Sequence, residues 1–297
     1  MIPENQTSGS DFILLGLFSS SHTSLVFFSS LFIIFILTVT ENVLLILLIH
    51  RDSGLHSSMY FLLSHLSLMD ILYISNNVPK VITNFLYGTR TISFAGCGFQ
   101  VFLSLALLGG ECLLLAAMSY DHYVAICHPL CYAVLVSDSI SVLLVAGAWL
   151  VGKQNSIVLT AYEIYFPFCE SRVMDHYFCE IPALLISIIF LLTPFSMILV
   201  SCVKILHTVL QTKSSEAQRK SFSTCFFHMV VVVMYYGAFI FTYMRPKSYH
   251  TPGQDKFLAI FYTILTPNLN PVIYSFRNED ALKAMKILLT CLPLAKK

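Results

Sequence analysis

The most chemically suggestive side chains lie in the segment 118–132, MSYDHYVAICHPLCY, which ends a long apolar run. An acid, an imidazole and a phenol follow one another there as Asp121, His122 and Tyr123. Such groups can exchange protons in catalysis, but the sequence has no His-Glu-x-x-His, no Gly-rich phosphate loop, no Gly-x-Ser-x-Gly and no Cys-x-x-Cys. We therefore expect neither an enzyme nor a cofactor.

Other ionisable side chains interrupt long apolar runs. Glu41, Asp70 and Glu111 lie within such runs, and Lys153 lies toward the end of another. A charge at the centre of a membrane helix costs about 2.5–3.5 kcal/mol by insertion measurements. For Asp70, which follows a stripe of serine and histidine, we expect a hydrated polar network rather than a simple packing contact.

The histidines show no metal-ligand spacing. His128, His176, His207 and His228 are scattered along the chain, and we expect each to be a surface or packing residue. Of the nine cysteines, Cys97, Cys169 and Cys179 fall on the side of the membrane where disulfides form. Cys97 can pair with one of the other two, which leaves one cysteine over.

Composition identifies the elements that must position these groups. The 297 residues are 57% hydrophobic and 11% charged, and the net charge is +1. In a typical soluble domain about a quarter of the residues are charged. The charge gives no reason to expect a nucleic-acid partner. Seven apolar runs have about 20 residues or more, enough to cross ~30 Å of hydrocarbon as helices. They are approximately 25–49, 59–78, 99–118, 140–161, 181–203, 222–244 and 257–276.

These runs predict an all-α membrane protein, a seven-transmembrane helix bundle forming a single domain over 1–297. An odd number of spans places the termini on opposite sides. Residues 1–24 carry a glycosylation sequon at Asn5 and no Lys or Arg, and with this segment outside, ten Lys and Arg fall on the cytoplasmic side and seven outside. We expect a multi-pass protein with an extracellular N-terminus, and no cleaved signal peptide. In the cytoplasmic tail 278–297, NEDALKAMKILL predicts a short amphipathic helix on the membrane lipid, with a solvated tail as the alternative.

Four sequence blocks resemble those of the olfactory receptors, a branch of the rhodopsin-like G-protein-coupled receptors. MYFLLSHLSLMDI (59–71) is similar to the family's second-helix signature, and MSYDHYVAICHPLCY to its third-helix exit. KSFSTCFFH (220–228) resembles the start of the sixth helix, and PNLNPVIYSFRN (267–278) the seventh. Their order on seven spans covers nearly the whole chain. The resemblance implies a receptor at the plasma membrane that binds a small volatile odorant and activates a heterotrimeric stimulatory G protein.

The resemblance also implies residue roles. Cys97–Cys179 would be the disulfide tying the third helix to the second outer loop. Asn42, Asp70 and Asn270 would form a polar network, with sodium possible at Asp70 and no other metal. Coupling and switching would involve Asp121, His122, Tyr123, Lys220, Asn270, Pro271 and Tyr274. Tyr236 would be the toggle below a pocket lined by Ser104, Leu105, Leu108, Gly109, Cys112, Phe239, Ile240, Tyr243, Ala259 and Thr263; plain helix packing is the alternative for each.

Three departures from the family pattern stand out. The family usually has arginine at His122, a longer and permanently charged side chain, so we predict weak coupling or coupling sensitive to cytoplasmic pH. Glu41 stands where the family has a glycine that allows close helix approach, so we predict impaired folding or surface delivery. Between HYFCEIPALL and LLTPFSMIL, roughly twenty residues of the family pattern are absent, equivalent to ~30 Å of helix. Pro182 and Pro194 would disturb the remaining helix, and Cys169 would lose its loop partner.

Two alternatives follow from these features. A degenerate, non-signalling receptor retained in the endoplasmic reticulum would account for the three departures. A multi-span transporter would instead show charged residues converging on a path and would carry substrate without a G protein.

Overall fold

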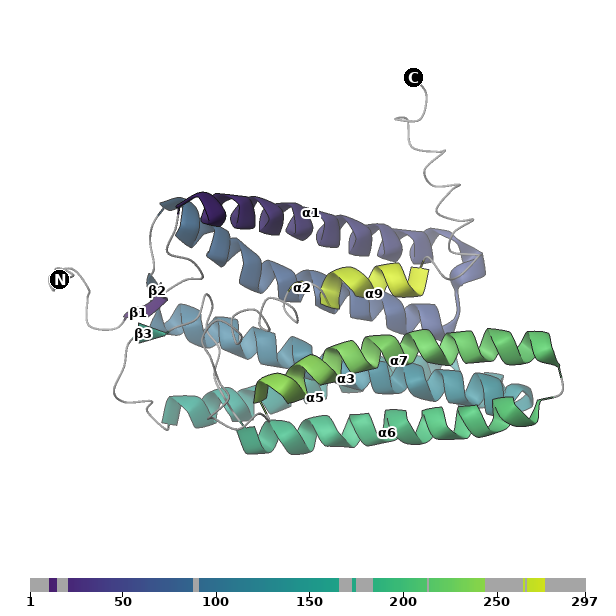
Figure 1. The fold of residues 1–297 in the computed structure, drawn as a ribbon. Helices are drawn as coiled ribbons and strands as arrows, with labels where there is room; N and C mark the ends of the chain where they lie inside the picture. The colour runs from purple at the N-terminus through teal and green to yellow at the C-terminus, as the bar shows by residue number, and fades with distance from the viewer. Residues whose placement is uncertain are drawn as a thin grey trace, which may run out of the picture.

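The described part of the chain is almost entirely helical (Figure 1). The computed structural model describes residues 11–14, 21–87, 91–165, 173–174, 184–212, 214–243, 264 and 266–275. Its main helices are α1 (Ser21–Arg51), α2 (Ser58–Tyr87), α3 (Phe94–Cys127), α5 (Asp138–Tyr165), α6 (Leu184–Gln211), α7 (Ser215–Tyr243) and α9 (Thr266–Ser275). Short helical turns η1 (Ser53–Leu55), η2 (Pro129–Cys131) and α4 (Tyr132–Leu135) lie between them.

Five of these helices are long and apolar enough to cross a membrane. The candidate spans are Val26–Arg51, Ser58–Asn84, Ala95–Cys127, Asp138–Ala161 and Leu191–Gln211, and α7 adds the shorter apolar segment Ser221–Gly237. Among the described residues, α9 covers the second half of the seventh predicted run. These helices confirm the prediction of a helical membrane bundle, and most of them extend past the apolar runs because backbone hydrogen bonds continue where the side chains become polar.

Helix α3 lies at the centre of the packing, in contact with α2, α5, α6 and α7. Glycine allows its closest approach to α5: a Cβ added at Gly152 would lie 2.6 Å from the Ala106 carbonyl oxygen and 2.8 Å from the Gly110 nitrogen. Ser156 on α5 also donates to the carbonyl of Phe102. Small residues at such contacts are the usual means by which membrane helices pack tightly.

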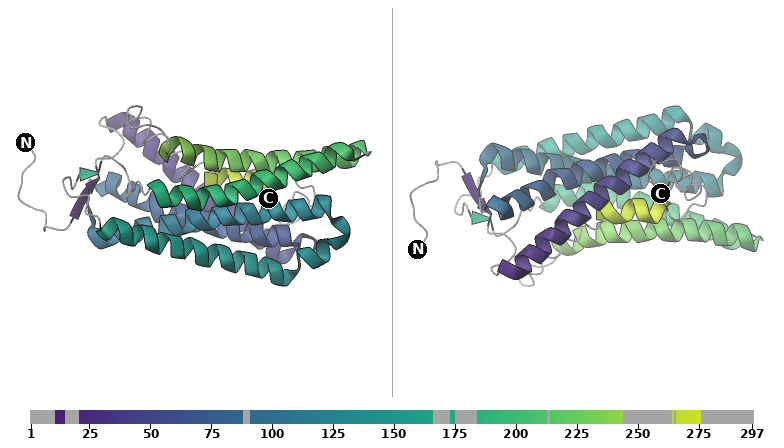
Figure 2. Two further views of the ribbon diagram at one scale, coloured as in Figure 1. Left: turned by 90° about the horizontal axis from the view of Figure 1, so that it is seen from below. Right: turned by 90° about the horizontal axis from the view of Figure 1, so that it is seen from above.

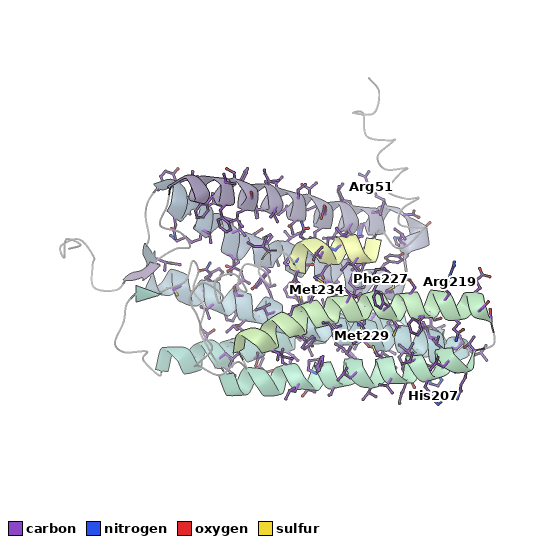
Figure 3. The ribbon with its side chains drawn as sticks, viewed as in Figure 1. Arg51, His207, Arg219, Phe227, Met229 and Met234 are labelled. Carbon is purple, nitrogen blue, oxygen red and sulfur yellow. The ribbon has the colours of Figure 1, made fainter. Side chains whose placement is uncertain are left out.

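The two ends of the bundle differ in character. At one end, which we term the sheet end, β1 (Asp11–Leu14) lies between β2 (Thr91–Ser93) and β3 (Val173–Met174), antiparallel to the first and parallel to the second (Figure 1). Arg51, His207 and Arg219 lie at the opposite end, which we term the basic end (Figure 3). Figure 2 shows α6 and α7 running side by side to this basic end. The sequence did not predict the small sheet.

The predicted disturbance of the fifth span by Pro194 can be compared with the structure, whereas three other predictions cannot. Pro194 lies inside α6, buried, and the helix continues unbroken through it to Gln211. Pro182, the sequon at Asn5 and the amphipathic segment after residue 277 lie outside the described residues, so these predictions stay untested.

Candidate functional site

Helix α3 carries five of the predicted pocket residues. Ser104, Gly109 and Cys112 are buried, and Leu105 and Leu108 are partly buried. From α7, Tyr236 is buried and Ile240 is exposed. Phe239 and Tyr243 belong to α7, but their side chains lie outside the description, as do Ala259 and Thr263 altogether. The pocket assignment therefore stays a prediction, and only part of its α3 and α7 lining lies within the described residues.

A tyrosine pair joins α7 to α3 at this level. The hydroxyl of Tyr235 donates to the carbonyl of Leu108 at 2.7 Å, and Cys112 lies beside both Tyr235 and Tyr236. The Tyr236 ring packs on Phe195 of α6, with ring centroids 5.0 Å apart. Its hydroxyl is buried and, apart from the Cys112 thiol beside it, has no hydrogen-bond partner among the described residues. A buried hydroxyl ordinarily has a partner, so this group is open to a ligand or a water molecule.

A cluster of amides fixes the Ser104 side chain. Asn76 on α2 donates to Ser104 Oγ at 2.9 Å and to the Gln100 carbonyl at 2.9 Å. Ser104 in turn donates to Asn77 Oδ1 at 3.3 Å, and Gln100 Nε2 donates to the Asn76 carbonyl at 3.2 Å. Sequence reasoning missed this α2–α3 cluster, although the adjacent Asn76-Asn77 pair inside an apolar run was a visible signal.

The predicted polar network is partly as expected. Asn270 on α9 donates to both carboxylate oxygens of Asp70 on α2, at 3.3 and 3.1 Å. Asn42 on α1 instead donates to the carbonyls of Thr38 at 2.9 Å and Pro267 at 3.1 Å. The structure therefore brings Asn270 onto Asp70, whereas Asn42 ties α1 to the start of α9.

Glu111 on α3 was not assigned to this network, yet it interacts electrostatically with Asp70. Both side chains are almost completely buried, and Glu111 Oε1 has no hydrogen-bond partner among the described residues. No cluster of three or more His, Cys, Asp or Glu side chains in the described ranges is arranged to hold a metal ion. The two carboxylates nevertheless offer the oxygen ligands that hard cations prefer, so their chemistry fits sodium with water completing its shell.

At the basic end, Asp121 contacts Tyr132 of the short helix α4. The Tyr132 hydroxyl donates to Asp121 Oδ1 at 2.8 Å, and the Asp121 side chain is 3% exposed. Burial, the Asp121 charge and this hydrogen bond together raise the pKa of Tyr132 above its ordinary value, so the phenol stays protonated. The bond holds the segment after α3 against the helix itself.

His122 turns toward α7. Its ring meets that of His228 edge to face, with centroids 5.3 Å apart and an interplanar angle of 83°. His228 Nδ1 hydrogen-bonds the Tyr274 hydroxyl on α9 at 2.8 Å. Three helices therefore meet through two imidazoles and a phenol. The sequence placed His122 and Tyr274 at the switch but treated His228 as a packing residue.

Three other predicted site residues have varied surroundings. The Tyr123 hydroxyl lies 3.0 Å from His128 Nε2, and Lys204 Nζ lies 5.3 Å from the centroid of the Tyr123 ring. Pro271 is buried inside α9. Lys220 lies in the first turns of α7, where its side chain is not described.

Cys97 at the start of α3 is disulfide-bonded. Its partner lies outside the described residues, so the pairing with Cys179 stays a prediction. The bond fixes the sheet-end start of α3 directly after β2.

Comparison with known proteins agrees with this arrangement. The family model for olfactory receptors matches residues 30–291. Human olfactory receptor 2AJ1 is 67% identical over 310 aligned positions, which span 99% of this chain and 94% of that protein. Human olfactory receptors 2T27 and 2T1 are 49% and 48% identical, over 96% and 95% of this chain and 95% and 81% of their own lengths.

The length of the first alignment bears on the predicted shortening. Its 310 positions exceed the 297 residues of this chain by 13, so receptor 2AJ1 carries at least 13 residues in that alignment that this chain lacks. The direction of this difference agrees with the deletion expected between Leu185 and Leu191. With a family model over most of its length and relatives matched nearly end to end, the chain belongs to the olfactory receptor family, whose fold is a seven-transmembrane helix bundle.

Proposed function

We propose that this protein is an odorant receptor of the plasma membrane that binds a small volatile ligand between α3 and α7 and activates a stimulatory G protein at its basic end. In this proposal the sheet end faces outward and the basic end faces the cytoplasm. That orientation is supported by the Lys and Arg distribution of the sequence.

One observation carries the proposal: polar contacts between helices recur from the candidate pocket to the basic end. Tyr235 binds α3 at Leu108, and Asn270 binds Asp70 farther along. His228 then joins α7 to Tyr274 of α9. Each contact crosses between helices that a conformational change would move, so a ligand that alters the α3–α7 contact can bias the others.

The basic end offers a surface suited to a protein partner. Leu130 is 99% exposed and Val134 is 76% exposed in the short turns after α3. Exposed large apolar side chains at the end of the bundle that also carries Arg51 and Arg219 favour an interaction surface. We assign this surface to the G protein.

The candidate ligand site favours a small, mostly apolar molecule with one hydrogen-bonding group. Leu105, Leu108 and Cys112 are apolar, whereas the Tyr236 hydroxyl is buried and has no described partner apart from the Cys112 thiol. A few polar groups in an apolar lining are usual for small-ligand sites. In the same proposal, Asp70 and Glu111 bind sodium below the ligand.

The decisive experiment combines surface immunostaining with a cyclic-AMP reporter against a panel of odorants in cells. We expect the chain to reach the surface and to respond to at least one odorant. Tyr236→Phe should then weaken the response to ligands with a hydrogen-bonding group more than to their apolar analogues. Surface-delivered protein that never responds, on a panel that activates other olfactory receptors, would support the degenerate alternative instead.

A further inference from the structure

We propose that His122 and His228 form a binding site for a transition-metal ion such as Zn²⁺ that bridges α3 and α7 near the basic end. The two residues are 106 positions apart in the sequence, so no local spacing indicates the site. Imidazole nitrogen is a preferred ligand of zinc, copper and nickel.

The ring spacing suits a shared ion. A zinc ion binds imidazole nitrogen at about 2.0–2.1 Å, so two rings on one tetrahedral ion have centroids roughly 5 Å apart. The His122 and His228 centroids are 5.3 Å apart. The present ring spacing therefore matches that of two imidazoles that share one ion.

An unsatisfied nitrogen points to a missing ligand. His228 is 1% exposed; the Leu115 carbonyl of α3 lies near its ring, but no hydrogen bond of normal geometry satisfies the Nε2 atom among the described residues. Its other nitrogen, Nδ1, lies 2.8 Å from the Tyr274 hydroxyl. When Nδ1 carries the proton and donates it to Tyr274, the lone pair stays on Nε2, and a hydrogen bond of this kind is the usual way in which a metal-binding histidine is oriented.

In the proposed site, the two histidines are the protein ligands and water molecules are the others. No third His, Cys, Asp or Glu in the described ranges completes a metal cluster, so water must fill the remaining positions. Ser119, one helical turn before His122, is 1% exposed; the Cys202 thiol lies near its hydroxyl, which has no hydrogen bond of normal geometry among the described residues. In the proposed site this hydroxyl would accept a hydrogen bond from a metal-bound water. Phe227 and Met229, which flank His228 in the chain, lie on the middle turns of α7 (Figure 3).

A bridging ion would have a mechanical consequence, which rests on the proposed function. It would hold α3 and α7 together at their present spacing and so oppose any separation that G-protein binding requires. Zinc would therefore reduce the odorant response.

Binding is tested apart from signalling, on the full-length receptor in detergent micelles. The melting temperature is measured in EDTA and across a series of Zn²⁺ concentrations. A ligand that binds the folded state alone raises the melting temperature progressively with concentration. We expect this rise in the wild-type chain and in His207→Gln, a control that removes an exposed histidine on α6. We expect it to be lost in both His122→Gln and His228→Gln.

A rescue variant covers the case in which His228→Gln does not fold. His122→Cys replaces imidazole by thiolate, a softer ligand, so stabilisation should return and should favour Cd²⁺ over Zn²⁺ more strongly than in the wild-type chain. The proposal is overturned if zinc does not stabilise the wild-type protein, if the rise persists in His122→Gln, or if His122→Cys responds to Cd²⁺ no more than His122→Gln does. Because none of these measurements uses an odorant, a failed signalling assay leaves their result intact.

Discussion

Replacing Tyr132 by phenylalanine isolates one contact at the basic end. The change removes the hydroxyl that donates to Asp121 Oδ1 at 2.8 Å and leaves the ring in place. A hydrogen bond to a charged group contributes about 1.5–3 kcal/mol, and the acceptor here is 3% exposed, so little water can replace the lost donor. For a chain of this size the loss corresponds to a fall in melting temperature of about 3–6 °C.

The pH dependence provides a second signature of the same bond. Since burial and the Asp121 carboxylate raise the pKa of Tyr132 in the folded protein, the unfolded phenol ionises first, at about pH 10. The stability that the bond contributes is complete below that pH and declines as the pH rises through the higher pKa of the folded state. Tyr132→Phe should therefore lose less stability than the wild-type chain between neutral and strongly alkaline solution.

The assay is thermal unfolding of the purified receptor in detergent, followed from pH 7 into the alkaline range. Tyr120→Phe is the matched control, because Tyr120 lies beside Asp121 in the sequence and its hydroxyl has no hydrogen bond to a described residue. Equal melting temperatures for the two variants at pH 7 would refute the assignment of stability to the Tyr132–Asp121 bond.

Further substitutions test the other features. Gly152→Ala should destabilise the receptor by about 1–3 kcal/mol through overpacking, because the new Cβ meets backbone atoms of α3 at 2.6 and 2.8 Å; Gly147→Ala on the same helix meets nothing within 4 Å and should melt no lower than the wild-type chain. Glu41→Gly should increase surface staining, since Glu41 Oε2 is buried without a described hydrogen-bond partner, and unchanged staining would count against a folding defect from this residue. His122→Arg should raise the odorant-dependent cyclic-AMP signal at matched surface expression, and no rise would contradict weak coupling through histidine.

The sequence predicts the helices of this protein better than the contacts between them. Apolar runs located every main helix, but α3 continues to Cys127, past the polar residues that seemed to end its run. Three strands of two to four residues are too short to show a pattern. β1 pairs with β2, where Phe12 faces Ile92, and with β3, where Ile13 faces Val173, so both pairings are far apart in the sequence. The small sheet therefore has no local signal.

In the candidate site, too, some contacts were predicted from the sequence and others were not. Asp70 and Asn270 were predicted to meet because both are polar residues at similar depth, and the structure places them in hydrogen-bond contact. Glu111, Tyr132 and His228 were assigned no role, since their contacts depend on the rotation of each helix about its own axis. A difference of one residue turns a side chain by about 100°, which apolar runs without a clear polar face do not determine.

Glu41 and His122, the two ionisable residues that depart from the family pattern, should have different consequences because their environments differ. Glu41 has a buried carboxylate oxygen with no described partner, so its cost falls on folding and membrane insertion, before any ligand is present. His122 instead packs its ring against His228, which in turn binds Tyr274, so the folded state accommodates it. An imidazole has neither the reach nor the permanent charge of arginine, and the effect of His122 should therefore emerge in coupling. Surface delivery and signalling per delivered receptor should accordingly separate the two residues, with Glu41 variants changing the first quantity and His122 variants the second.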